Sequence, residues 1–135
     1  MRKIVLSVIV FLSSLNLYAQ QIVSIDIVRI DQRYEREAMH YYEQNWKAFR
    51  EAALGDGHIS GFNLLRTMTD STQHFNLVLI TEFPDSASFN NREANFRPIM
   101  KRISPGGPKL LNRVPPKQFL EYVNGVDAVS VVRGP

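Results

Sequence analysis

The most extended pattern of apolar and polar positions runs from Asp31 to Gly57 and predicts one long amphipathic helix. Apolar or small side chains recur at steps of four, four, four, three and four residues: Tyr34, Ala38, Tyr42, Trp46, Phe49 and Ala53. At about 100° per residue these positions share one face of a helix. The opposite face is charged or polar: Arg33, Arg36, Glu37, His40, Lys47, Arg50 and Glu51. Asp31 is a suitable N-cap and Gly57 a suitable end, and the aromatic face needs a sheet to cover it.

Four other segments have the β-branched or alternating composition of strands: residues 21–30, 59–68, 75–83 and 117–123. The polar residues 69–73 connect the second and third of these strands as an antiparallel hairpin. Both faces of the first strand are apolar, with these side chains alternating along it: Val23, Ile25 and Ile27 on one face, and Ile22, Val28 and Ile30 on the other. Such a strand is expected to be covered on both sides.

A second helix is predicted after Pro84, with Asp85 as its N-cap. Its inward positions are apolar: Phe89, Phe96, Ile99, Met100 and Ile103. Pro98 lies inside this pattern and has no backbone N–H to donate. The sequence therefore predicts a break near Asn95 and a helical turn that resumes at Pro98.

The predicted order, β-α-β-β-α-β, indicates an α+β protein with the four-stranded antiparallel sheet of ferredoxin-like folds. Two helices cover only one face of such a sheet, and the other face here carries Ile, Val, Leu and Phe. Leaving that face in water forfeits roughly 25 cal/mol per Å² and favours aggregation. The sequence therefore predicts a homodimer, with a monomer whose C-terminal tail folds beneath the sheet as the alternative. The segment from about residue 124 is predicted to be an added edge strand or an arm that crosses to the partner.

The N-terminus has the features of a cleavable secretory signal over residues 1–19. Arg2 and Lys3 begin it, an apolar run follows, and Ala19 offers a small residue before the expected cut. A retained membrane anchor is the alternative, but about 16 residues holding three Ser and one Asn are short for a span of roughly 20. The remaining residues, 20–135, suit a single domain.

The cysteine content bears on the cellular compartment of the protein, and its net charge bears on whether it binds nucleic acid. The chain has no cysteine, which excludes disulfides and a lipid-modified N-terminal Cys. We therefore expect a periplasmic or secreted protein with no stable membrane insertion after cleavage. Removing Arg2 and Lys3 from the 16 basic residues leaves 14 against 13 acidic ones, a net charge near +1. Nucleic-acid binding through a basic surface has no support from this charge.

The run GHISGFNLLRTMTDSTQHFNLVLITEFPDSASFNN, residues 57–91, resembles the middle of the dimeric α/β-barrel superfamily, which includes the antibiotic-biosynthesis-monooxygenase-like domains. The positions that carry the resemblance are Gly57, Phe62, Leu64, Arg66, Glu82, Phe83 and Phe89. The resemblance covers roughly residues 22–123. It implies ferredoxin-like protomers that pair into a dimeric α/β barrel. It gives little information about a reaction or a ligand.

The same resemblance implies a ligand pocket between the sheet and the helices. Some enzymes of the superfamily bind an aromatic substrate or haem there, between Asn, Trp, Tyr or His side chains. The residues expected to line it here are Tyr42, Trp46, Asn63, Phe89 and Phe96, with Arg66 near the rim. Aromatic residues at helical spacing are usually core, which is the interpretation we favour, and no catalytic residue is assigned.

No cofactor is expected. The haem-degrading members need a His on the second helix, and residues 85–104 contain none. A metal site is also not predicted, because His40 lies on the polar face of its helix and no carboxylate stands at ligand-like spacing to two histidines.

Two functions are weighed against these patterns, and a role in an envelope assembly through the C-terminal arm is a third possibility. The leading one is an exported homodimer that binds a small apolar or aromatic molecule, or only itself, without established catalysis. The alternative is a cofactor-independent monooxygenase acting on an aromatic or quinol-like substrate, which requires a cavity of several hundred Å³ with a few convergent polar groups.

Overall fold

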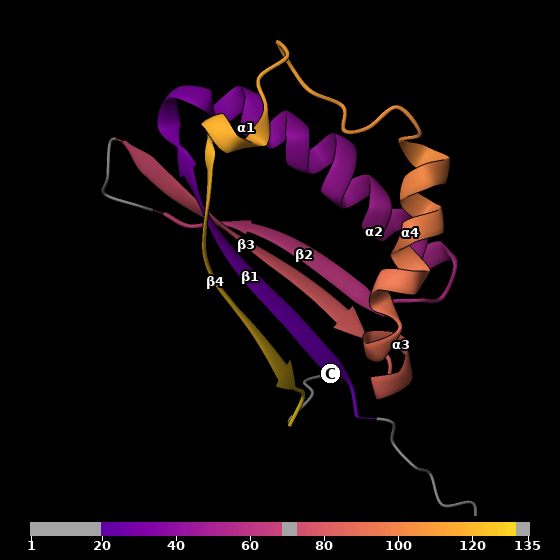
Figure 1. Cartoon of the computed structure of the whole chain (residues 1–135). Coiled ribbons are helices and arrows are strands. Elements are labelled where there is room, and N and C mark those ends of the chain that lie inside the picture. The colour runs from indigo at the N-terminus through magenta and orange to yellow at the C-terminus, as the bar shows by residue number, and fades with distance from the viewer. Residues whose placement is uncertain (1–19, 69–72, 132–135) are drawn as a thin grey trace, which may run out of the picture.

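The computed structural model describes residues 20–68 and 73–131, in which helices cover one face of a four-stranded sheet (Figure 1). The strands are β1 (Ile22–Asp31), β2 (Gly61–Arg66), β3 (His74–Phe83) and β4 (Leu120–Val129). The helices are α1 (Glu35–Tyr41), α2 (Ala48–Gly55), α3 (Ser86–Asn90) and α4 (Arg92–Ile103). A π-helical segment (Tyr42–Lys47) joins α1 to α2, and 3-10 turns precede α1 (Gln32–Tyr34) and β4 (Pro116–Gln118).

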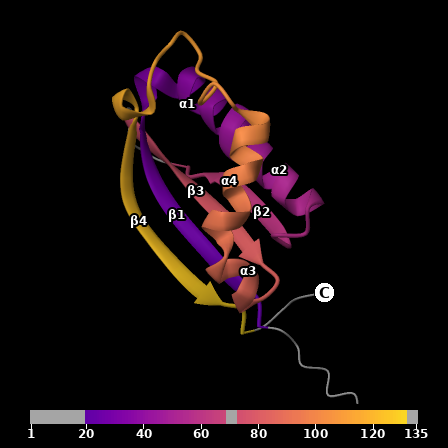
Figure 2. The same cartoon turned by 45° about the vertical axis from the view of Figure 1, so that its right-hand side comes forward.

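The strand order is β2-β3-β1-β4, and every neighbouring pair is antiparallel. This is the predicted β-α-β-β-α-β arrangement, and it confirms the α+β, ferredoxin-like fold class. Figure 2 shows from a second direction that α1, α2 and α4 lie on the same face of the sheet. The central strands β1 and β3 agree with the predicted strands to one residue at each end, whereas β2 is shorter at both ends than predicted.

The core lies between the central strands and the long helical run. Its buried side chains are Val28, Ile30, Ala38, Tyr42, Phe75, Leu77, Leu79 and Phe119. A second cluster lies beneath α2 and α4 and contains Ala53, Ile59, Phe83 and Ile99. Full burial of side chains such as Phe75 and Leu77 stabilises the fold by about 1.5–3 kcal/mol each. Both clusters include residues of the predicted inward helix face, which is thereby confirmed.

The π-helical segment has a cause in the spacing of the inward residues. A step of four residues advances about 40° beyond a full turn of an α-helix. The drift accumulates over Ala38, Tyr42 and Trp46, which are spaced by four. A π-helical turn is wider, with hydrogen bonds from i to i+5, and so brings the later positions back towards the sheet.

Both predicted N-caps and the predicted helix end are confirmed. The Asp31 carboxylate accepts a hydrogen bond of 2.9 Å from the Arg33 backbone N–H, and Asp85 accepts one of 2.7 Å from Ser88 N–H. Hydrogen bonds from the side chain and backbone of Arg33 lower the pKa of Asp31 from 3.8 to about 2. Gly57 has a φ of 77°, the left-handed conformation that ends the helix at low cost.

The second helical segment differs from the prediction. Its break lies at Asn91, between α3 and α4, so the predicted break near Asn95 and restart at Pro98 are wrong. Pro98 lies inside α4, where it costs about 3 kcal/mol. The burial of Ile99, which is 1% exposed, helps to offset that cost. Met100, predicted to point inward, is 48% exposed.

The last strand is longer and later than predicted. Pro116–Gln118 form a 3-10 turn, because a proline fixes φ and suits the first position of a helical turn. The strand then continues to Val129, with Val126 opposite Ile25 of β1. Residues 124–129 therefore belong to the sheet and do not form a separate arm. Residues 22–30 of β1 supply the backbone partners that extend it.

The sheet face away from the helices is apolar at its centre, as predicted. We call it the open face, and its central side chains are Val23, Ile25 and Ile27 of β1, Leu65 of β2, Val78 and Ile80 of β3, and Val126 and Ala128 of β4. Within the described chain no helix covers this face (Figures 1 and 2). Leu65 and Val126 are 43% and 54% exposed, so a single copy leaves apolar surface in water.

Some predictions fall on residues outside the described part. These are the signal at 1–19, most of the turn at 69–73, and the end of the C-terminal segment at 132–135. Among the residues that are described, none of the helices combines the length and hydropathy needed to cross a membrane.

Candidate functional site

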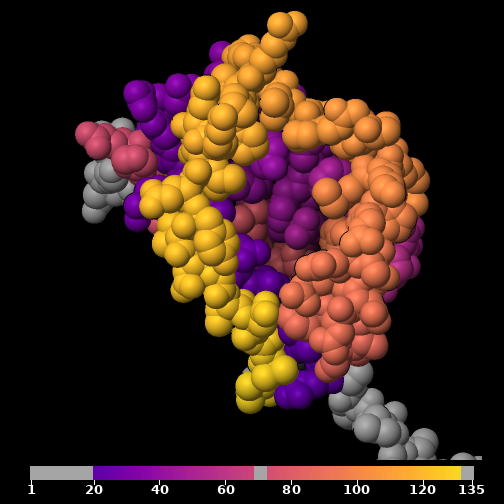
Figure 3. Space-filling view, in the orientation of Figure 1, coloured from indigo at the N-terminus to yellow at the C-terminus, as the bar shows by residue number. Residues whose placement is uncertain are grey.

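A cavity of about 740 Å³ opens on the helix side of the sheet. Its walls come from β1 and β3, from α2 and α4, and from the segment that follows α4. In the space-filling view the surface is hollowed between β4 and α4 (Figure 3). The hollow lies where the helix-facing side of β1 changes from the buried Val28 and Ile30 to Asp26 and Ser24. These smaller polar side chains do not fill the space beneath α4.

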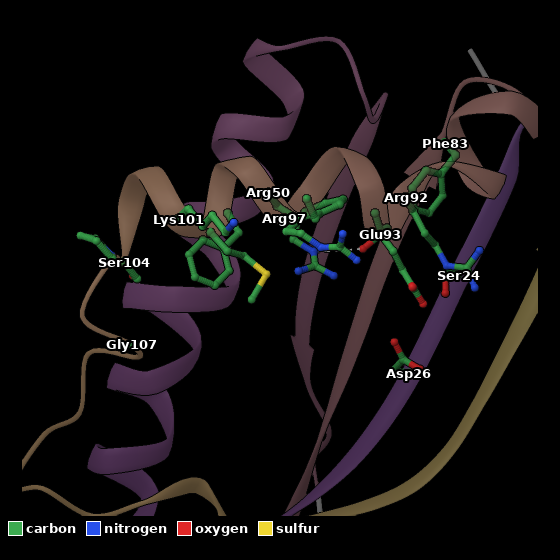
Figure 4. A pocket seen from close by; sticks show the side chains of 15 residues that line it. Ser24, Asp26, Arg50, Phe83, Arg92, Glu93, Arg97, Lys101, Ser104 and Gly107 are labelled. Atoms are coloured by element: carbon green, nitrogen blue, oxygen red, sulfur yellow. Dashed lines mark hydrogen bonds between the residues drawn. The ribbon is translucent and has the colours of Figure 1, made fainter.

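Arg50 is the most unusual group in the cavity. It comes from α2, and its guanidinium carbon lies 4.6 Å from the centre of the Trp46 ring and 4.8 Å from that of Phe96. Its Nε donates a 3.3 Å hydrogen bond to Thr81 Oγ1 (Figure 4). Burial lowers the pKa of Arg50 from 12.5 to about 10, and the charge of Asp26 acts in the opposite direction. Among residues 20–68 and 73–131 no carboxylate forms an ion pair with it.

The rest of the lining is mixed in charge, with basic side chains in excess. Four basic residues line the cavity, namely Arg50, Arg92, Arg97 and Lys101, against two acidic ones, Asp26 and Glu93. Figure 4 shows Asp26 on β1 and Glu93 on α4 entering the same space as Arg50. Apolar surface is supplied by Phe49, Phe83, Phe96, Met100 and Pro105. The cavity therefore combines flat apolar walls with positive charge, which suits a planar molecule that carries a polar group.

Ser104 adds a polar group at the end of the cavity nearest the segment after α4. Its Oγ is buried and has no hydrogen-bond partner within the described chain. A buried hydroxyl without a hydrogen-bond partner costs free energy, so Ser104 lowers the stability of this end of the cavity wall.

Asp26 is held in place from β4. The Tyr122 hydroxyl donates a 3.3 Å hydrogen bond to Asp26 Oδ1. Gly125 lies opposite Asp26 in the register, and a Cβ there would collide with Tyr122 Oη and lie 2.6 Å from Asp26 Oδ1. A residue without a side chain is therefore required for Tyr122 to reach the carboxylate.

Of the six predicted pocket residues, one lines the cavity and two contact side chains that line it. Phe96 lines it. Trp46 lies behind Arg50, and Phe89 lies beneath Arg92, whose guanidinium carbon is 4.2 Å from the ring centre. Arg92 Nη1 also donates to the Phe89 carbonyl oxygen at 2.9 Å.

The other three predicted residues lie elsewhere. Tyr42 is 4% exposed and belongs to the main core. Asn63 pairs with Ile80 of the open face, so its side chain is on the opposite side of the sheet from the cavity. Arg66 forms an ion pair with Glu35 and lies over the ring of Phe75 at 4.0 Å. None of these three lines the cavity.

Arg50 was placed by the sequence on the charged helix face, and this placement is wrong. It follows Trp46 by four residues and therefore shares its side of the helix, a signal that could have identified it. Asp26 gave a second signal, because it interrupts the apolar residues on one face of β1. Within the described residues no group of three or more His, Cys, Asp or Glu side chains is placed to hold a metal ion.

Among the comparisons with known proteins, only the one with solved structures found a match, and it concerns the fold. No protein-family model matches the sequence, and no curated protein is detectably similar to it. A dimeric ferredoxin-like protein from an uncultured marine organism is similar in structure, with a TM-score of 0.51 and 13% identity over 85% of this chain and 99% of that chain. The fold is ferredoxin-like.

Two other solved structures align over comparable lengths. HapK from Hahella chejuensis has a TM-score of 0.46 at 13% identity, over 85% of this chain and 96% of its own. A second dimeric ferredoxin-like protein from an uncultured marine organism has a TM-score of 0.47 at 9% identity, over 84% and 91%.

Proposed function

We propose that this protein is an exported homodimer that binds a small, largely apolar or aromatic molecule in the cavity between α2, α4 and the sheet. The observation that carries the binding function is the cavity itself. A space of about 740 Å³ with aromatic walls and a few inward polar groups has the size and character of a small-molecule site.

The homodimer is supported by the open face. Its exposed apolar centre is larger than isolated surface residues account for, and a second copy would cover it through a two-fold contact. The structurally similar protein with the TM-score of 0.51 is described as dimeric. Pairing through the open face leaves the cavity accessible, since the two lie on opposite sides of the sheet.

Export is supported by the composition of residues 1–19, which lie outside the described part of the chain. The basic start, apolar run and small Ala19 favour cleavage before Gln20. In a bacterial host, we expect mass spectrometry of the periplasmic or secreted fraction to find a chain that begins at or next to Gln20. Recovery of the full-length chain in membranes would contradict this proposal.

Filling the cavity tests the binding function. Ser24 lies on the helix-facing side of β1 and lines the cavity, so a Phe at this position occupies the space intended for the ligand. In calorimetric titrations with benzene- and naphthalene-based probes, we expect Ser24→Phe to weaken binding by at least roughly tenfold. The control is Gln44→Phe, which adds the same ring at an exposed position outside the cavity. Equal binding by Ser24→Phe and wild type, or no binding by wild type, would contradict the proposal.

A cofactor-independent monooxygenase is the second candidate. The size of the cavity and the entry of Asp26 and Glu93 beside Arg50 favour it, because carboxylates can accept a proton and a guanidinium can stabilise the resulting anion. Oxygen uptake with the probes that bind separates the two candidates. If wild type takes up oxygen and Asp26→Asn does not, the enzyme is favoured. If wild type takes up no oxygen, the protein only binds its ligand.

A further inference from the structure

The hydrogen-bonding capacity of Arg50 exceeds what the described chain uses. A guanidinium has five N–H donors, and the one side-chain hydrogen bond found for it uses Nε, on Thr81. Trp46 and Phe96 lie against the group within 5 Å and fix its plane, which leaves its outer edge directed at the cavity (Figure 4). Holding a cation in a partly desolvated site without a carboxylate partner is costly, and an anion there would remove that cost.

The charges around Arg50 point in the same direction. Arg97 and Lys101 are exposed on α4 and line the same cavity, so they raise the potential at its mouth. On the side nearer β1, Asp26 and Glu93 enter the cavity together with Arg92, so the charges there are mixed. A ligand with an anionic group beside Arg50 therefore gains attraction that an uncharged ligand does not.

From this geometry we infer that the ligand is an aromatic carboxylate whose carboxylate binds the free edge of Arg50 and whose ring lies against Phe96 and Phe49. The inference rests on the proposed binding function of the cavity and names the chemical class of its ligand. The planar fork of arginine matches the two oxygens of a carboxylate, which a lysine cannot reproduce. Ser104, Pro105 and Gly107 line the cavity beyond this point and bound the space for the ring.

Matched pairs of probes test the inference. Benzoate, phenylacetate and naphthoate are compared with their uncharged amides by isothermal titration calorimetry. Trp46, the single tryptophan of the chain, lies against Arg50 and reports binding at that position through its fluorescence. We expect at least one carboxylate to bind wild type roughly tenfold or more tightly than its amide.

Three variants locate the charge that is recognised. Arg50→Met keeps an unbranched apolar stem and removes the cation, and we expect it to lose carboxylate affinity by roughly 10- to 100-fold while amide affinity changes little. Arg50→Lys keeps the charge without the fork and is expected to retain part of the preference. Arg36→Met is the control, because Arg36 is exposed on the same helical run and does not line the cavity.

Each outcome separates this inference from the proposed function. If carboxylates and amides bind equally, and both are lost in Ser24→Phe, the binding function stands and the inference is overturned. An unchanged carboxylate preference in Arg50→Met also overturns it. If Arg50→Met does not fold, Arg50→Lys decides. A carboxylate-over-amide preference as large in Arg50→Lys as in wild type would contradict recognition by the two donors of the guanidinium. Failure of wild type to bind any probe would overturn both.

Discussion

The Val78→Asp variant is expected to be a monomer at concentrations at which the wild type is a dimer. Val78 lies at the centre of the open face, with Ile27 on one neighbouring strand and Leu65 on the other. In a two-fold dimer each copy would bury one new carboxylate against apolar side chains of its partner. An unpaired buried charge costs at least about 3 kcal/mol, which weakens association by roughly a hundredfold or more. Sedimentation velocity measures the change directly.

The matched control for this variant is Asn76→Asp. It introduces the same charge on the same face of β3, two residues away, but beside Arg29 at the polar end of the face. We expect it to stay dimeric. Because Val78 is already partly exposed in one copy, the Val78→Asp monomer should keep its circular dichroism spectrum. A wild type that sediments as one chain, or a Val78→Asp variant that remains a dimer, would show that the open face is not the interface.

Asn45→Ala is expected to destabilise the fold by about 2–3 kcal/mol and to lower the melting temperature by about 10 °C. Asn45 is 2% exposed within the π-helical segment. Its Nδ2 donates to the carbonyl oxygens of Tyr41 and Lys109, both at 2.9 Å, and its Oδ1 accepts from Lys109 N–H at 2.8 Å. The alanine loses all three hydrogen bonds and leaves a small cavity. Thermal unfolding followed by circular dichroism measures the loss.

Gln44→Ala provides the comparison for this variant, since the neighbouring Gln44 is exposed and its truncation should change stability by less than about 0.5 kcal/mol. The pair of bonds to Lys109 also anchors the segment after α4, of which Ser104, Pro105 and Gly107 line the cavity. Ligand affinity should therefore fall together with stability in Asn45→Ala. A melting temperature equal to that of Gln44→Ala would mean that water replaces the amide without loss.

Asn45 also illustrates what a pattern of residues leaves out. It follows Tyr41 by four residues and is buried, on the inward side of the helical run. Its partner Lys109 is 64 residues later, in a segment with no periodic pattern. A hydrogen bond between such distant positions depends on where the two segments pass each other, which local spacing does not describe.

The candidate site likewise contains residues that local spacing places correctly and one that it does not. Spacing placed Trp46, Phe89 and Phe96 on the inward helix faces, and the family resemblance implied their place in a pocket. Phe96 lines the cavity, and the other two contact the lining residues Arg50 and Arg92. Arg50 was missed because charged residues on an amphipathic helix usually face water. Here Trp46 and Phe96 cover its guanidinium instead, and this contact needs α4 to pass beside α2.

The sequence by itself determined the order of the elements, the caps at Asp31 and Asp85, and the two apolar faces of the sheet. These features depend on contacts within a few residues or on a period of two or four, so they can be read along the chain. Only the tertiary structure decided the cavity, the burial of Arg50, the extension of β4 to Val129 and the tolerance of Pro98 within α4. Each of these depends on packing between elements far apart in sequence, where burial and pairing outweigh local preference.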